Sequence, residues 1–155
     1  MAESSLLLRN RAHGHVVEQW AATTLLPKIH KAVRVVGGQH YPDSCGYDVE
    51  ADGILYEVKS CMQRVKRRAV GSGSQPGRWK IDTLQHAELA EADAARAMYL
   101  LVTCDDVGPF EAYVCSHAVM GDILAQYARQ GQYVSVTTSV WTRRLVRIYR
   151  RGRRA

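Results

Sequence analysis

The segment 46–60 constrains the fold most, because its side chains alternate in character around a turn signal. Asp52-Gly53 is typical of a two-residue hairpin loop, since glycine adopts positive φ without steric cost. The flanking residues therefore predict two antiparallel strands, 47–50 and 54–60. We expect this hairpin to fix the centre of a sheet.

The second strand has two different faces, because successive side chains of a strand point to opposite sides of the sheet. One face is apolar and is expected to pack in the core; it carries Ile54, Tyr56 and Val58. The other carries Glu57 and Lys59, and Asp48 reaches it from the facing strand. Two converging carboxylates offer the hard oxygen ligands that Mg²⁺ or Mn²⁺ prefers, and the Val58 carbonyl is a further candidate ligand. Lys59 would hold or deprotonate a water, or stabilise charge on a phosphate.

The spacing Asp48-x8-Glu57-Val58-Lys59 resembles the PD-(D/E)XK nuclease superfamily, which includes restriction endonucleases and archaeal Holliday-junction resolvases. The resemblance covers about residues 14–103. It implies an α/β fold with a restriction endonuclease-like αβββαβ core, in which helices flank a central mixed sheet, here followed by a C-terminal helix and strands. It also implies a Mg²⁺-dependent hydrolase, with Mn²⁺ able to substitute, that cuts DNA to leave a 5′ phosphate and needs no small-molecule cofactor.

Two further residues take candidate roles from the same resemblance. Glu18 lies in the pattern Gly14-x3-Glu18-x3-Ala22, which is similar to the first helix of resolvase-like nucleases, where a glutamate reaches the metal. Gln85 lies on the helix expected after the strands, where a glutamine often supports the lysine or the attacking water. His86, beside it, is either a phosphate contact or proton carrier, or an ordinary surface histidine.

A second aspartate, Asp43, is an alternative to Asp48 as the first metal ligand. Pro42-Asp43 spells the "PD" of the superfamily name, but a Pro-led loop favours an aspartate that caps a turn. Asp48 is favoured, because it lies inside a strand at hairpin distance from Glu57. Asp105-Asp106 stands beside Gly and Pro and indicates a turn.

The net charge of +6, from 21 Lys+Arg and 15 Asp+Glu, favours a polyanionic partner, with nucleic acid first. Candidate nucleic-acid contacts are Arg64, Lys66, Arg67, Arg68, Arg78 and Lys80. Residues 71–77 are rich in Gly and Ser, so we expect a flexible basic arm that closes on DNA. We predict a single domain over 1–149 and a basic tail over 150–155 that is too charged to pack.

Outside the hairpin, periodicity and capping residues predict the remaining elements. A helix is expected from Ser4 or Ser5 to about Leu26, and another from 82 or 83 to 97 with Thr83 as N-cap. That second helix would bury an apolar side made of Leu84, Leu89, Ala92 and Ala95. Further expected elements are strands 33–36, 98–103, 110–115, 133–137 and 145–149, and a helix from Ser116 to Gln130.

Sequence patterns also give expectations for the compartment and the partners of the protein. No apolar run suits a membrane span and no signal peptide is evident, so we expect an intracellular, cytoplasmic protein without a membrane partner. The cysteines show no zinc spacing; Cys45 and Cys61 flank the hairpin and could pair. Similarity to the resolvases implies a homodimer acting on branched DNA. A restriction-type or mobile-element nuclease, and a non-cleaving nucleic-acid-binding module, are the alternatives, and RNA stays open as a substrate.

Overall fold

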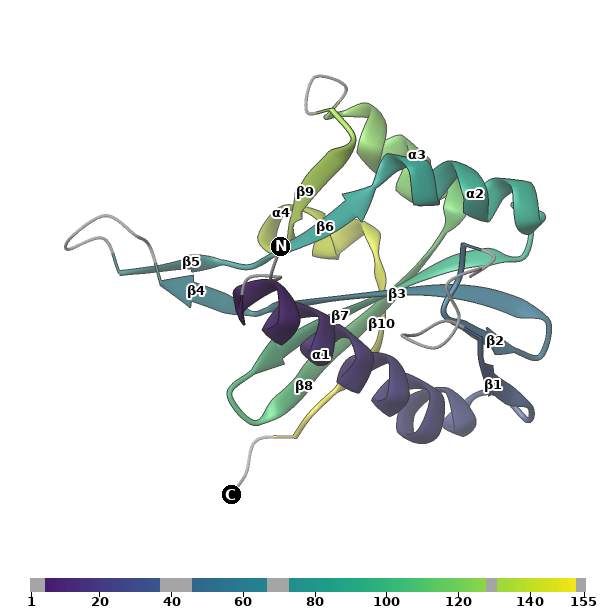
Figure 1. Ribbon diagram of the computed structural model, residues 1–155, viewed down its shortest axis with the longest axis horizontal. Coiled ribbons are helices and arrows are strands. Elements are labelled where there is room, and N and C mark those ends of the chain that lie inside the picture. The colour runs from purple at the N-terminus through teal and green to yellow at the C-terminus, as the bar shows by residue number, and fades with distance from the viewer. Residues whose placement is uncertain (1–4, 37–45, 67–72, 128–130, 153–155) are drawn as a thin grey trace.

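The computed structural model describes residues 5–36, 46–66, 73–127 and 131–152, with the backbone alone for 5–12 and 66. Helices cover both faces of a central sheet (Figure 1). The helices are α1 (Ser5–Trp20), α2 (Thr83–Asp93), α3 (His117–Ala125) and α4 (Thr138–Trp141). Shorter turns are a π-helix (Ala21–Leu25) and two 3-10 helices (Leu26–Lys28 and Thr142–Arg144).

The main sheet has six strands in the order β1-β2-β3-β7-β8-β10. Their bounds are β1 (Val33–Val35), β2 (Val49–Ala51), β3 (Ile54–Met62), β7 (Ala97–Asp105), β8 (Gly108–Ser116) and β10 (Val146–Arg150). The β3–β7 pair is parallel and the other pairs are antiparallel, so the sheet is mixed. Two ribbons stand beside it: β4 (Arg64–Lys66) with β5 (Ser74–Pro76), and β6 (Arg78–Asp82) with β9 (Tyr133–Thr137). The predicted fold class is therefore confirmed.

The predicted hairpin is present as β2 and β3. Ala51 pairs with Ile54 across the loop, and both loop residues have positive φ, 49° at Asp52 and 81° at Gly53. This is the conformation of a tight two-residue hairpin turn. The Asp52 carboxylate also accepts the backbone N–H groups of Lys31 and Ala32, both at 2.9 Å. The turn therefore anchors the segment that leads into β1.

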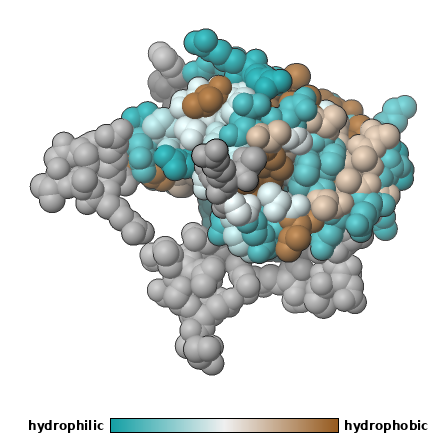
Figure 2. Space-filling view, turned by 90° about the horizontal axis from the view of Figure 1, so that it is seen from above, coloured by the Kyte–Doolittle hydropathy of each residue, from teal (hydrophilic) through white to brown (hydrophobic). Residues whose placement is uncertain are grey.

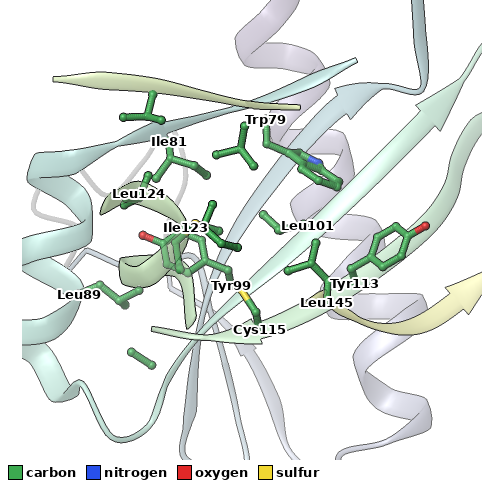
Figure 3. Close-up of a cluster of buried hydrophobic side chains, with 14 of the residues drawn as sticks. Trp79, Ile81, Leu89, Tyr99, Leu101, Tyr113, Cys115, Ile123, Leu124 and Leu145 are labelled. Atoms are coloured by element: carbon green, nitrogen blue, oxygen red, sulfur yellow. The ribbon is translucent and has the colours of Figure 1, made fainter. Parts of the chain in front are cut away.

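A separate hydrophobic core lies on each face of the sheet. Val17 and Ala21 pack with Tyr56 and Val58 on the α1 side. The other core lies under α2, α3 and the β6–β9 ribbon, and Figure 3 shows Trp79 and Tyr99 within it. The Trp79 indole N–H donates to the Val102 carbonyl at 3.0 Å, so its polar atom is satisfied. This second core ties the ribbon to β7.

The predicted helix after the hairpin differs in three respects. Asp82 is the N-cap in place of Thr83, and its carboxylate accepts the Leu84 N–H at 2.9 Å. The helix ends at Asp93 rather than 97. Of the expected apolar side, only Leu89 is buried, and Leu84 is 59% exposed. The reason is that residues 78–82 form strand β6, and its pairing with β9 fixes the direction in which the helix starts.

The segment expected to be a flexible loop is partly strand. β3 extends to Met62, and β4 pairs with β5 to form an arm that projects from the body of the protein (Figure 1). Arg64 holds this arm together, because its guanidinium donates to the Ser74 hydroxyl at 2.9 and 3.1 Å and to the Ser74 carbonyl at 3.0 Å. Residues 67–72, with Arg67 and Arg68, lie outside the described residues.

Part of the predicted basic tail is also folded. Arg150 ends β10. The Arg151 N–H donates to the Phe110 carbonyl at 2.8 Å, and its guanidinium bonds to the Pro109 carbonyl at 3.1 Å and to the Asp105 carboxylate. Specific partners on the β7–β8 turn therefore overcome the charge that suggested an unpacked segment. Residues 153–155 lie outside the described residues.

The remaining elements agree with the expectations in kind. The first helix continues through its π and 3-10 turns to Lys28. Ser116 caps α3 by accepting the Val119 N–H at 3.2 Å. Figure 2 shows hydrophilic residues over much of the face that it presents, with hydrophobic residues between them. Of the helices in the described ranges, none combines the length and apolar character that a membrane crossing requires.

Candidate active site

The site lies where β2 and β3 separate. Asp48 directly precedes β2, and its N–H donates a hydrogen bond to the Tyr56 carbonyl of β3 at 2.9 Å. One step further, the Asp48 carboxylate itself accepts the Val58 N–H at 2.8 Å. The Asp48 side chain thus supplies the hydrogen-bond acceptor that a neighbouring backbone would supply to Val58 in a regular sheet. This bond fixes the Asp48 carboxylate at the fork, the point where β2 and β3 separate.

Glu57 is one of the most buried charged residues described, with 2% exposure. It stands next to Tyr99 of β7 in the parallel register and shares a side-chain hydrogen bond with Asp48. Its Oε1 atom has no hydrogen-bond partner of good geometry among the described residues, although the Lys59 ammonium contacts it closely. Glu57 therefore holds an oxygen that is incompletely satisfied, an arrangement that costs stability in a buried position.

Two helices complete the site from opposite faces of the sheet. Gln85, in the first turn of α2, accepts a hydrogen bond from the Lys59 ammonium at 2.9 Å. Glu18 comes from α1, and its side chain is 18% exposed with His15 Nδ1 at 3.7 Å. Glu18 interacts electrostatically with both Asp48 and Lys59. The fold thus brings together Glu18, Asp48, Glu57, Lys59 and Gln85, the residues predicted as catalytic.

Burial and mutual repulsion make the carboxylates hard to ionise. Burial, and then the nearby Asp48 charge, raises the pKa of Glu57 to about 8 and that of Glu18 to about 7. Burial raises the pKa of Asp48 as well, in spite of its hydrogen bond from Val58. Burial alone would lower the pKa of Lys59, but Glu57 outweighs it and raises that pKa. Three carboxyl groups therefore face a single ammonium group, so additional positive charge would stabilise their ionised forms.

The donor set fits a divalent cation in part. Asp48 raises the pKa of Glu57 further after burial, and Glu57 Oε1 lacks a well-aligned donor, so cationic charge at this point would be stabilised. Oxygen ligands of this kind suit Mg²⁺ or Mn²⁺. In the parts of the chain described, however, no three His, Cys, Asp or Glu side chains form a ready metal-binding group. The fit thus rests on the two carboxylates Asp48 and Glu57.

These pKa shifts predict that the metal-free protein loses stability from pH 6.5 to 8. The folded state keeps protons on Glu18 and Glu57 that the unfolded chain, with ordinary pKa values, has already released, so raising the pH favours unfolding. His86, whose pKa burial lowers to about 4, opposes this trend mainly below the window and only weakly at its lower end. We expect a loss of roughly 2 kcal/mol, which corresponds to a fall in Tm of about 4–8 °C.

Thermal unfolding in EDTA across this pH range measures the effect. Glu57→Gln removes one of the two groups and should reduce the slope, whereas the exposed Glu91→Gln should leave it unchanged. A wild-type Tm that stays constant or rises between pH 6.5 and 8 would contradict the assigned shifts.

The other candidate residues lie apart from this cluster. Arg64 is on the arm, and Arg78 and Lys80 point outward from β6, where Lys80 lies 4.1 Å from the centre of the Tyr133 ring. Of Lys66 only the backbone is described. Asp43 and Cys45 lie outside the described residues, and Cys61 is a free thiol. The predicted turn at Asp105 is present, with the Asp105 carboxylate accepting the Val107 N–H at 2.9 Å.

The sequence alone did not reveal two neighbours of the site. His15 lies one helical turn before Glu18, and this i,i+3 spacing could have revealed it. Tyr99 comes beside Glu57 only through the parallel register of β3 and β7. The Tyr99 hydroxyl and His86 Nδ1 are 2.9 Å apart, and the ring of His86 stacks on that of His117 with centres 3.8 Å apart. His86 is therefore part of the contact between α2 and the sheet.

Comparison with known proteins gives one match. The family model of the PD-(D/E)XK nuclease superfamily domain matches residues 4–130 of this chain. No curated protein and no solved structure matches at a significant level. The matched region contains all five residues gathered at the fork.

Proposed function

This chain belongs to the PD-(D/E)XK nuclease superfamily, and we propose that it is a metal-dependent endonuclease that hydrolyses DNA phosphodiester bonds. The observation that carries the proposal is the meeting of Asp48, Glu57 and Lys59 where β2 and β3 separate. Glu18 and Gln85 reach the same point from two helices. A solvated surface hairpin would not bury a glutamate to 2% exposure beside two other acids.

In this proposal Asp48 and Glu57 hold the metal directly. The Val58 carbonyl is a third ligand, because the N–H and C=O of one strand residue point to the same edge, and the Val58 N–H points at Asp48. Glu18 holds the metal directly or through water. When bound, Mg²⁺ or Mn²⁺ supplies an activated water and neutralises charge on the phosphate.

Lys59 orients the water and the scissile phosphate as an ammonium group. Its raised pKa disfavours a role as a neutral base. Gln85 keeps the lysine in place through their 2.9 Å hydrogen bond, and both side chains are partly buried. Since a catalytic group must be held in a productive orientation, Gln85 acts by restricting where the ammonium can point.

The preferred substrate in this proposal is branched DNA, cut by a homodimer as in a junction resolvase. The basic surface supports a nucleic-acid substrate: Arg64 extends along the arm, and Arg78 and Lys80 face outward from β6. Such contacts bind phosphates and position the strand without reading its sequence. They therefore suit recognition of shape.

A cleavage panel tests the proposal. Four-way junctions, linear duplex, flaps, single strands and an RNA strand are incubated with the protein in Mg²⁺, Mn²⁺ or EDTA, and the Asp48→Ala variant is run beside it. We expect metal-dependent nicking, strongest on the junction, that is absent in EDTA and in Asp48→Ala. Gel filtration with light scattering tests the homodimer.

Each other result identifies a different alternative. Preferential cleavage of linear duplex would favour a restriction-type or mobile-element nuclease. Binding with no metal-dependent nicking of any substrate would favour a non-cleaving nucleic-acid-binding module. Nicking that survives Asp48→Ala would refute the assigned site.

A further inference from the structure

A polar hollow lies at the root of the arm, away from the carboxylates of the fork. Its volume is about 230 Å³, and it lies between β4–β5, β7–β8 and the start of α4. Five hydroxyl-bearing residues line it: Thr103, Tyr113, Thr138, Ser139 and Thr142. None of the five residues gathered at the fork contributes to its lining. The hollow is therefore distinct from the candidate active site.

Thr103 gives this hollow a binding capacity that the fold itself does not use. Its residue exposure is 2%, and its hydroxyl oxygen has no hydrogen-bond partner among the described residues. An unpartnered buried hydroxyl costs free energy, so folding alone does not explain a threonine here. Thr138 is also a buried polar residue, with its backbone N–H held by the Gly77 carbonyl at 3.2 Å. The backbone that carries Thr138 is thus fixed at the edge of the hollow.

The charges around the hollow favour an anion. Arg64 lines one side, with its guanidinium oriented by Ser74. A second hollow of about 260 Å³ shares Tyr113 and Thr142 with the first and adds Arg143 and Arg147.

The carboxylate in the lining is already neutralised. Glu111 accepts the Tyr113 hydroxyl at 2.6 Å and lies 3.3 Å from Arg147 and 3.6 Å from Arg150. Arg64 and Arg143 therefore give the paired hollows an excess of positive charge. Hydroxyl donors together with arginines match the hydrogen-bonding needs of a phosphate group.

The position relates the hollow to the proposed cleavage site. Thr103 stands beside Cys61 in the β3–β7 register, and Cys61 shares a sheet face with Glu57 and Lys59 because side chains alternate. Gln63, which lines the hollow, is four residues beyond Lys59, or roughly 13 Å along an extended strand. The hollow therefore lies within a few nucleotides of the proposed cleavage point along a bound strand.

We infer that the paired hollows bind a phosphate of the nucleic-acid strand a few nucleotides away from the scissile bond. The inference rests on the proposed nucleic-acid substrate and adds a second anchoring point for it. The Thr103 hydroxyl donates to a phosphate oxygen, and Arg143 neutralises its charge. Fixing the strand at two points sets its direction across Lys59.

Strand binding in EDTA tests the inference without any cleavage. Fluorescence anisotropy measures Kd for a labelled single strand and a labelled duplex, with 5′-deoxymononucleotide and inorganic phosphate as competitors. The variants are Thr103→Val, which removes only the hydroxyl, and Arg143→Gln. Arg96→Gln is the charge-matched control, because Arg96 is exposed and pairs with Asp93 near the opposite end of β3.

We expect Thr103→Val to raise Kd roughly tenfold, as for a lost hydrogen bond to a charged group, while its Tm is unchanged or higher. Arg143→Gln should raise Kd several-fold, and Arg96→Gln less than twofold. Unchanged binding by Thr103→Val, or equal losses in the two arginine variants, would overturn the inference. Tighter binding of the mononucleotide than of either strand would also overturn the inference, because the hollows would then hold a free nucleotide. Binding that depends on the hollows without cleavage in metal would refute the nuclease proposal alone.

Discussion

Glu57→Gln should abolish metal-dependent cleavage and at the same time stabilise the protein. The substitution keeps the shape of the side chain but removes the negative charge of a proposed metal ligand. Altering residues that merely support such ligands typically costs 10–100-fold, so we expect a loss of more than about 100-fold here. Gel-based nicking of the preferred substrate in Mg²⁺ measures it.

The stabilisation follows from the environment of Glu57. At pH 8 the wild-type protein holds this carboxyl at 2% exposure beside Asp48, with one oxygen poorly satisfied. A neutral amide avoids the cost of ionising there, and its oxygen can still accept from Lys59. We expect a gain of ~1–3 kcal/mol in EDTA, or roughly 2–10 °C in Tm. Such a trade between stability and activity is common at functional sites.

The exposed Glu91→Gln is the matched control and should change neither quantity. Cleavage within a few-fold of wild type in Glu57→Gln would remove this residue from the site. A lower Tm would mean that Glu57 is a structural residue whose charge the fold needs.

Gly77→Ala should destabilise the protein strongly. A Cβ atom at this position would lie 1.7 Å from the Met62 carbonyl oxygen and 3.2 Å from the Cys61 sulfur. The backbone cannot easily withdraw, because the Gly77 N–H donates to Gln63 at 3.0 Å and its carbonyl accepts from Thr138 at 3.2 Å. Overpacking against the Met62 backbone should cost more than ~3 kcal/mol.

The measurement is thermal unfolding by circular dichroism, with an expected fall of at least ~6 °C or failure to fold. Gly14→Ala is the control, because a Cβ atom added at Gly14 inside α1 would meet nothing within 4 Å. Alanine in a helix should raise stability by about 0.5–1 kcal/mol. A Gly77→Ala variant with wild-type Tm would show that β3 and β6 are not in contact as described.

The hairpin and its acidic face could be predicted because all the information is local. Alternation set the two faces of residues 54–60, and Asp52-Gly53 set the turn. The predicted partner strands of the main sheet are also confirmed in kind. The roles assigned to Asp48, Glu57 and Lys59 remain predictions that the cleavage assays must test.

Two of the missed features, β6 and the contacts of Arg151, depend on distant partners, whereas β4 and β5 pair with each other within residues 64–76. β6 is only five residues long, and its partner β9 lies about 50 residues further along the chain. Residues 78–82 do alternate between polar and apolar side chains, a strand signal that was interpreted as a connection, so the buried side of α2 was also predicted wrongly. Arg151 was assigned to an unpacked tail, because its partner Asp105 is 46 residues earlier. Local pattern cannot reveal such long-range contacts.

The junction between β3 and the arm has a mechanical consequence. One residue, Gln63, separates the strand that carries Glu57 and Lys59 from β4. Its N–H is held by the Cys104 carbonyl at 2.7 Å, and its own carbonyl is held by the Gly77 N–H at 3.0 Å. A force that pulls on the arm is therefore absorbed by these two bonds, four residues before it could reach Lys59. We therefore expect displacement of the arm to leave the geometry around the lysine largely unchanged.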